Sequence, residues 1–127
     1  MEVIKMRKKI YITGAQITNE QELHLQIEPD VLLTEIKPAG QMLVDSDDLS
    51  FVYLLEKDDD YTYLVIKDEF WPLLKKGIEG QTSVFLKHED IKLELDQFFE
   101  ELEYLVENIK GNSNYGETMV AKVEEVF

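Results

Sequence analysis

Acidic side chains crowd one short stretch of the sequence, Asp45-Ser46-Asp47-Asp48. Carboxylate oxygens at this spacing are ligands that Ca²⁺ and Mg²⁺ prefer. The EF-hand pattern fails, however, because Ser50 stands at the sixth position, where that loop needs glycine, and Glu56 at the twelfth falls in a predicted strand. Asp and Ser side chains also hydrogen-bond nearby backbone N–H groups, so the first prediction is a turn. Asp45, Asp47 and Asp48 are kept as candidate binding residues.

A second acidic loop, Asp58–Asp60, could supply further oxygen ligands to a looser cation site. The apolar segment Phe51–Leu55 lies between the two loops and has the composition of a strand. Five or six extended residues would separate the loops by roughly 17–20 Å. We therefore expect that the two loops do not share an ion.

Donors and acceptors also gather in Asn112–Gly116, which precedes a predicted last helix. Polar groups at a helix N-terminus can bind a small anion or a partner. The alternative is a turn between two helices, which needs a cap and residues that tolerate the left-handed conformation. Asn112, Asn114 and Tyr115 are kept as candidate binding residues.

Catalytic constellations are missing from the sequence. It has no cysteine, no phosphate-binding glycine loop, no metalloprotease helix motif and no nucleophile elbow. Of the two histidines, His24 falls on the polar face of a predicted strand and His88 in a turn beside two acids, so both are expected to be solvated. We therefore predict no catalytic residue, no metal ligand and no cofactor.

Charge is the strongest compositional feature, with 27 acidic against 13 basic residues and a formal net charge of −14. Such a surface repels phosphate backbones and anionic membranes, so neither nucleic acid nor membrane is expected as a partner. Several tyrosines would suit a sheet on which RNA bases stack, but that mode needs a basic field. The acidity by itself can serve solubility alone.

The element expected to organise the fold is a β-hairpin over Phe51–Ile66, with a charged loop at Lys57–Asp60. Phe51, Tyr53 and Leu55 would lie on one face of its first strand, with apolar residues on the other face as well. Strands that are apolar on both faces are usually covered on both faces. We therefore predict that this hairpin forms the centre of the sheet.

Other strands follow from alternation of apolar and polar residues. They are Ile10–Ile17 with a bend at Gly14, Leu23–Ile27, Val31–Ile36, the short Gln41–Val44 after a loop at Lys37–Gly40, and a hairpin of Ser83–Lys87 with Ile91–Leu95. Periodicity near 3.6 instead predicts helices over Asp68–Lys76, from a cap at Asp96 to Ile109, and from a capping box of Asn114 with Glu117 to Phe127. The lone tryptophan, Trp71, is expected in the core.

The predicted fold class is therefore α+β: an antiparallel sheet of about six strands built from hairpins, with one short middle helix and two C-terminal helices packed on one face. A chain of 127 residues has the length of one domain, so residues 1–127 are predicted to form a single domain. Residues 1–6 are interpreted as a lead-in. Met6 is a candidate second start, because a strand pattern follows it directly.

Two motifs carry a resemblance to a known family. They are Gly40–Asp47, followed by an aromatic strand pair, and Glu107–Glu117, which continues to Val123–Glu125. The chain resembles the YjbL-like family of small proteins of Gram-positive bacteria over most of its length from about Met6 onward. The resemblance implies a coherent fold, a bacterial cytoplasmic setting and a start near Met6. The function of that family is unknown, so the resemblance implies no site residue.

The first functional hypothesis is a small acidic, cytoplasmic, non-enzymatic protein-binding or regulatory module. Its partner would be a basic or partly apolar protein or a second copy in a homodimer, contacted through the C-terminal helix. The alternative is a divalent-cation-binding domain or a small metal-assisted hydrolase that uses the Asp45–Asp48 loop. A third idea is an acidic mimic of nucleic acid. Cytoplasmic location agrees with the absence of cysteine and of an apolar run near the roughly 20 residues that span a bilayer.

Overall fold

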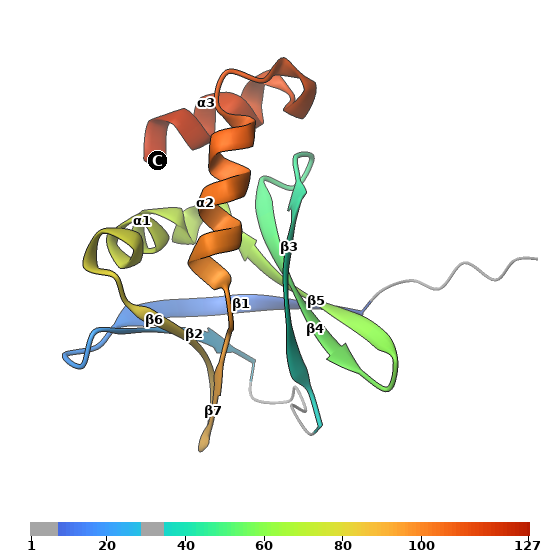
Figure 1. Cartoon of the computed structure of the whole chain (residues 1–127), viewed down its shortest axis with the longest axis vertical. Coiled ribbons are helices and arrows are strands. Elements are labelled where there is room, and N and C mark those ends of the chain that lie inside the picture. The colour runs from blue at the N-terminus through green and yellow to red at the C-terminus, as the bar shows by residue number, and fades with distance from the viewer. Residues whose placement is uncertain (1–7, 29–34) are drawn as a thin grey trace, which may run out of the picture.

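The computed structural model describes residues 8–28 and 35–127, which form a curled mixed β-sheet with helices packed against it (Figure 1). The strands are β1 (Lys8–Ile17), β2 (Glu22–Ile27), β3 (Lys37–Asp45), β4 (Ser50–Lys57), β5 (Asp60–Lys67), β6 (Ser83–His88) and β7 (Ile91–Glu94). The helices are α1 (Trp71–Gly80), α2 (Phe98–Ile109) and α3 (Glu117–Val126), with short 3-10 helices η1 (Asp68–Phe70) and η2 (Ser113–Tyr115). The α+β class is confirmed.

The sheet has seven strands in the order β3-β4-β5-β1-β2-β6-β7. The pairs β1/β5 and β2/β6 are parallel, and the other four pairs are antiparallel. The prediction of an antiparallel sheet of about six strands is therefore only roughly right. Parallel pairs join strands that are distant in the sequence, so hairpin patterns in the sequence do not predict these pairs.

Strand β1, rather than the predicted hairpin, holds the central place in the sheet. Its first half, Lys8–Tyr11, pairs with β5, and its second half pairs with β2. The register shifts between Ile12 and Gly14, which confirms the predicted irregularity at that glycine. A Cβ atom at Gly14 would lie 2.6 Å from Oε1 of Gln26, so a larger residue there would require the end of that flexible side chain to move.

The predicted hairpin forms as β4 and β5, and its alternation is as expected. Phe51, Tyr53 and Leu55 enter the main core together with Leu64 and Ile66. The opposite face carries Val52, Leu54 and Val65, which are also buried. The turn between the strands is shorter than predicted, because Lys57 and Asp60 pair and only Asp58 and Asp59 remain, both with positive φ.

The helices cover one face of the sheet. Trp71 and Leu74 of α1, Leu102 of α2, and Met119 and Val123 of α3 join the same core cluster as the inner residues of the strands. Figure 1 shows α2 standing over the sheet with α3 across its far end. Among the described residues, no helix is long and apolar enough to cross a membrane.

Two predicted boundaries are wrong for local reasons. Lys37–Gly40, predicted as a loop, belongs to β3, because an irregularity between Pro38 and Met42 accommodates the proline and glycine in an edge strand. Residues 31–34 of the strand predicted at 31–36 lie outside the described residues. Helix α2 follows Gln97 in a left-handed conformation rather than a cap at Asp96.

The two edges of the sheet are protected in different ways. On β3, the backbone N–H of Met42 donates to Oε1 of Glu101 on α2, at 3.3 Å. On β7, the strand is only four residues long and carries charged side chains. Both devices hinder edge-to-edge pairing with another chain.

Candidate functional site

Two stretches that are about 65 residues apart in the sequence meet at one end of the molecule. The Asp45–Asp48 turn joins β3 to β4, and the Asn112–Gly116 segment joins α2 to α3. Together they enclose a cavity of about 300 Å³, called here the turn cavity. Its lining consists of Ser46, Asp47, Leu49, Tyr115, Gly116, Glu117, Thr118 and Met119.

Hydrogen bonds within the Asp45–Asp48 turn engage two of its three carboxylates. Oδ1 of Asp45 accepts from the backbone N–H of Asp48 at 3.2 Å. Oδ1 of Asp48 accepts from Nζ of Lys67 at 2.7 Å, and that hydrogen bond raises the pKa of Lys67. The predicted turn is confirmed, and Asp47 is left as its exposed carboxylate.

The Asn112–Gly116 segment is also held by its own side chains. Oδ1 of Asn112 accepts from the N–H of Asn114 at 3.1 Å, and its Nδ2 donates to the carbonyl of Asn108 at 3.2 Å. Asn112 therefore caps η2. The predicted capping box of Asn114 with Glu117 is wrong, because Gly116 is the residue that precedes α3.

The six candidate residues separate into three groups. Asp47 and Tyr115 line the turn cavity together. Asp45 lines a second cavity of about 380 Å³ on the outer face of the sheet, and Asp47 borders that one as well. Asp48, Asn112 and Asn114 line neither cavity: Asp48 pairs with Lys67, and the side chain of Asn112 accepts from the backbone N–H of Asn114.

Sequence reasoning missed two polar residues of the turn cavity, Glu117 and Thr118. Glu117 begins α3 directly after Gly116, and its carboxylate complements the helix dipole. The lining thus includes the carboxylates of Asp47 and Glu117 and no lysine or arginine. The signal in the sequence was Glu117 itself, which we had interpreted only as half of a capping box.

A metal centre has no support among residues 8–28 and 35–127, where no three His, Cys, Asp or Glu side chains are placed to hold an ion. The Asp45–Asp48 turn and the Asp58–Asp59 turn lie at opposite ends of β4, as expected.

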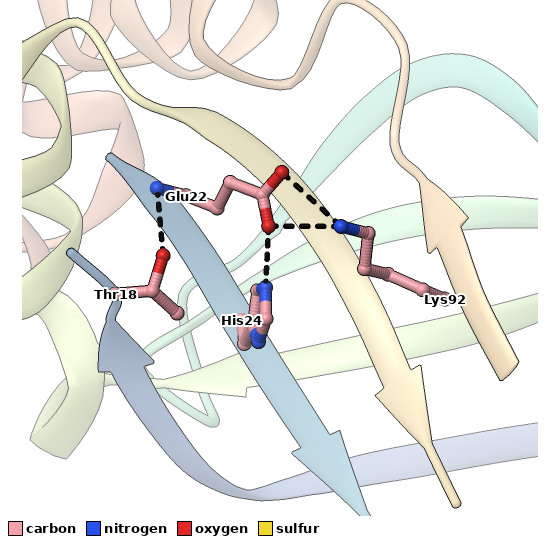
Figure 2. Close-up of polar contacts among 4 residues, drawn as sticks. All are labelled: Thr18, Glu22, His24 and Lys92. Atoms are coloured by element: carbon pink, nitrogen blue, oxygen red, sulfur yellow. Dashed lines mark hydrogen bonds and ion pairs between the residues drawn. The ribbon is translucent and has the colours of Figure 1, made fainter. Parts of the chain in front are cut away.

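A separate polar cluster lies on the outer face of β2, β6 and β7 (Figure 2). Oε1 of Glu22 bonds Nε2 of His24 at 2.9 Å, and Nζ of Lys92 donates to both carboxylate oxygens at 2.9 and 3.1 Å. The ring of Phe85 lies against His24 and under Lys92. These contacts tie three strands together.

Both histidines are less solvated than predicted. The side chain of His24 is only 14% exposed, because Glu22 and Phe85 flank it on the polar face. His88 is buried at the end of β6, where it pairs with Ile91.

Acid is expected to weaken the polar cluster. Hydrogen bonds from His24 and then Lys92 hold the pKa of Glu22 below its ordinary value of 4.5. A lowered folded-state pKa stabilises the protein above pH 4.5, and this contribution disappears as the pH falls through the lowered pKa. Urea unfolding of the wild type and Glu22→Gln between pH 6 and about pH 3 should show a smaller loss of stability in the variant. Glu20→Gln in the adjacent exposed turn is the control, and an unchanged slope in Glu22→Gln would contradict the assignment.

Comparison with known proteins identifies relatives along nearly the whole chain. The model of a family of unknown function, UPF0738, matches residues 10–127. The UPF0738 protein YjbL of Bacillus subtilis is 46% identical over 96% of this chain and 99% of its own length. Relatives from Geobacillus sp. and Bacillus velezensis are 41% and 44% identical over the same share of this chain and 98% and 99% of their own. No solved structure matches the chain significantly.

Proposed function

The chain belongs to the UPF0738 family of unknown function, and from the geometry of the turn cavity we propose that it is a protein-binding module that takes a basic segment of a partner protein. The single observation that carries this proposal is that the two turns form one cavity, which Asp47, Tyr115 and Glu117 line together.

The size and chemistry of the turn cavity suit one long basic side chain. A volume of about 300 Å³ lies at the lower limit of ligand sites. Carboxylates bind a guanidinium group through paired, charge-assisted hydrogen bonds, and an aromatic ring attracts the same cation. Asp47 and Glu117 can supply the first interaction and Tyr115 the second. An arginine side chain is therefore the preferred occupant, with lysine as the weaker one.

The charge of the whole chain favours the same class of partner. A net charge of −14 attracts basic proteins over long distances and accelerates their encounter. The first nine residues contain four of the thirteen basic residues, so the acidity is concentrated in the rest of the chain. Binding of this kind weakens as salt concentration rises.

The predicted contact through the apolar stripe of the C-terminal helix is not part of this proposal. Met119 and Val123 of α3 are buried against the protein's own core. The surface offered to a partner is instead the first turn of α3, with Glu117 and Thr118. The divalent-cation alternative gains no specific observation, because the carboxylates of Asp45 and Asp48 are already engaged within the fold.

The test is an NMR titration of the ¹⁵N-labelled protein with a short arginine-containing peptide. We expect amide shifts in residues 46–49 and 115–119. The double variant Asp47→Asn/Glu117→Gln should bind about tenfold more weakly or worse, because charge-assisted hydrogen bonds contribute roughly 1.5–3 kcal/mol each. A lysine peptide and a peptide with neutral citrulline in place of arginine test the ranking.

A matched control is available at the other end of β4. The variant Asp58→Asn/Asp59→Asn removes the same charge from the opposite turn, and asparagine tolerates the positive φ at both positions. This control should bind like the wild type. Equal weakening of both double variants, or shifts spread over the whole acidic surface, would contradict a specific site.

A further inference from the structure

The outer face of β3, β4, β5 and β1 is apolar, and no helix of residues 8–28 and 35–127 packs on it. The strand register aligns Leu43, Val52, Val65 and Tyr11 in one row across the four strands. Val52, Leu54 and Val65 form a small cluster of their own, packed with Ala39 and Tyr63, and no helix residue belongs to it. We call this surface the outer face. It is separate from the core face that α1, α2 and α3 cover.

Large apolar side chains are unusually exposed on the outer face. Tyr11 is 45% exposed, Leu43 is 44% and Tyr61 is 36%, and these are three of the five exposed large hydrophobic residues in the described part of the chain. Val52 and Val65, which lie between Leu43 and Tyr11 in the row, are buried, so the exposed apolar surface is at the two ends of the row. Exposed large apolar side chains gathered on one face mark contact sites in soluble proteins. The cavity of about 380 Å³ between Lys9, Leu43, Tyr63 and the Asp45–Asp47 segment gives the face a concave centre.

Two charges on the rim of the outer face, Lys9 and Asp45, have opposite signs and lie at opposite corners, while Lys67, in the row of Asp45, is already paired with Asp48. Lys9 lies on β1 and pairs with Tyr63, whereas Asp45 lies on the far strand β3 and pairs with Ser50. The register therefore places Lys9 and Asp45 three strand spacings apart across the sheet. Along the strands, the two residues are two side-chain rows apart. With strands about 4.8 Å apart and rows about 6.7 Å apart, their Cα atoms are roughly 20 Å apart along the diagonal.

We propose that two copies of this chain associate through the outer face. A two-fold axis in the plane of the contact, perpendicular to the diagonal from Lys9 to Asp45, places Lys9 of each copy over Asp45 of the other. The same operation places Leu43 near Tyr63 of the second copy. The two sheets then cross at a large angle, as in orthogonal sheet packing.

Charge complementarity selects a second copy as the occupant. A uniformly basic partner would meet Lys9, and a uniformly acidic partner would meet Asp45. A second copy supplies an acid opposite the base and a base opposite the acid, which is the self-complementarity that a two-fold contact requires. Only four strands take part, so the contact is smaller than a permanent interface, and association is expected to depend on concentration.

The experiment is sedimentation equilibrium over a range of roughly 10 µM to 1 mM. The wild type should change from monomer to dimer in this range. Leu43→Lys and Tyr11→Lys should each weaken dimerisation about tenfold or more, since both bury a charge in the contact. Ile91→Lys on β7 and Tyr104→Lys on α2 are matched controls with 46% and 66% exposure, and both should dimerise like the wild type.

A charge swap tests the pairing itself. Lys9→Asp and Asp45→Lys should each weaken the dimer, and the double variant should restore it to within about threefold, because the opposite charges then face each other again. Asp45 also accepts a hydrogen bond from Asp48, so circular dichroism checks the fold of Asp45→Lys. If that variant does not fold, Lys9→Asp and Leu43→Lys decide the question.

A chain that stays monomeric at 1 mM, a double swap that fails to restore a folded dimer, or equal losses in the two control variants would each overturn the proposal. None of these variants alters Asp47, Tyr115 or Glu117. Peptide binding at the turn cavity can therefore fail or succeed independently of dimerisation.

Discussion

Trp71→Ala is expected to destabilise the protein by roughly 3–5 kcal/mol, as removal of a large buried aromatic side chain does. Trp71 is fully buried at the start of α1. Its ring lies 4.9 Å from that of Phe51 on β4 and 6.1 Å from that of Phe127 at the C-terminus, between centroids. Its Nε1–H donates to the carbonyl of Ile66 at 3.2 Å. Alanine would leave a cavity where three elements meet and would remove the hydrogen bond to the Ile66 carbonyl.

Urea unfolding followed by far-UV circular dichroism measures this loss, because the variant has no tryptophan for fluorescence. Trp71→Phe should cost less than alanine, since it keeps an aromatic ring and loses mainly the hydrogen bond. Tyr104→Ala on the exposed side of α2 should change stability by about 0.5 kcal/mol or less. A loss below about 1.5 kcal/mol for Trp71→Ala would mean that the site collapses easily or is not packed as described.

A second large effect is expected in alkali and comes from Tyr53. Burial, reinforced by the carboxylates of Asp96 and Glu101, raises the pKa of Tyr53 to about 12, against an ordinary value of 10. Its hydroxyl donates to the carbonyl of Asp96 at 2.8 Å, and its ring stacks on Phe98. The folded state therefore strongly prefers the neutral phenol.

The sign of the pH dependence follows from this preference. A raised folded-state pKa gives stability that is complete below pH 10 and is lost between pH 10 and about 12, because the unfolded chain ionises first. The full loss is on the order of 3 kcal/mol. Tyr53→Phe should lose about 1 kcal/mol at pH 7 with the hydrogen bond, and its alkaline slope should be shallower than that of the wild type.

Urea unfolding at pH 8, 10 and about 11 compares the two proteins. Tyr104→Phe serves as control, because its ring is 66% exposed. Identical alkaline slopes in the wild type and Tyr53→Phe would show that Tyr53 ionises in the folded protein as it does in the unfolded chain.

The hairpin shows how far local pattern extends. The alternation in Phe51–Ile66 predicted which side chains share a face, and β4 and β5 follow it. The same pattern suggested that the body of the hairpin is only core. In the folded protein, Val52 and Val65 instead line the cavity on the outer face, together with Leu43 and Lys9. Leu43 belongs to β3 and Lys9 to β1, and the pattern of the hairpin does not predict which strands pair with it.

The candidate site divides in the same way. Sequence reasoning selected Asp47 and Tyr115 separately, as parts of two unrelated turns. Their meeting depends on α2, which carries the chain from the core back to the β3–β4 end of the sheet, where Asn112 and Gly116 redirect it into α3. Glu117 was interpreted as a cap because its nearest polar neighbours in sequence offered that role.

Local sequence patterns were enough to predict the hairpins, the buried faces of α1 and α2, the burial of Trp71 and the acidity of the chain. Those signals come from side-chain periodicity and turn chemistry within a few residues. Three features became visible only in the folded chain: β1 lies between β5 and β2, two parallel pairs make the sheet mixed, and two distant turns enclose one cavity. The physical reason is that strand pairing uses backbone groups that nearly every residue carries, so the choice of partner depends on packing across the whole chain.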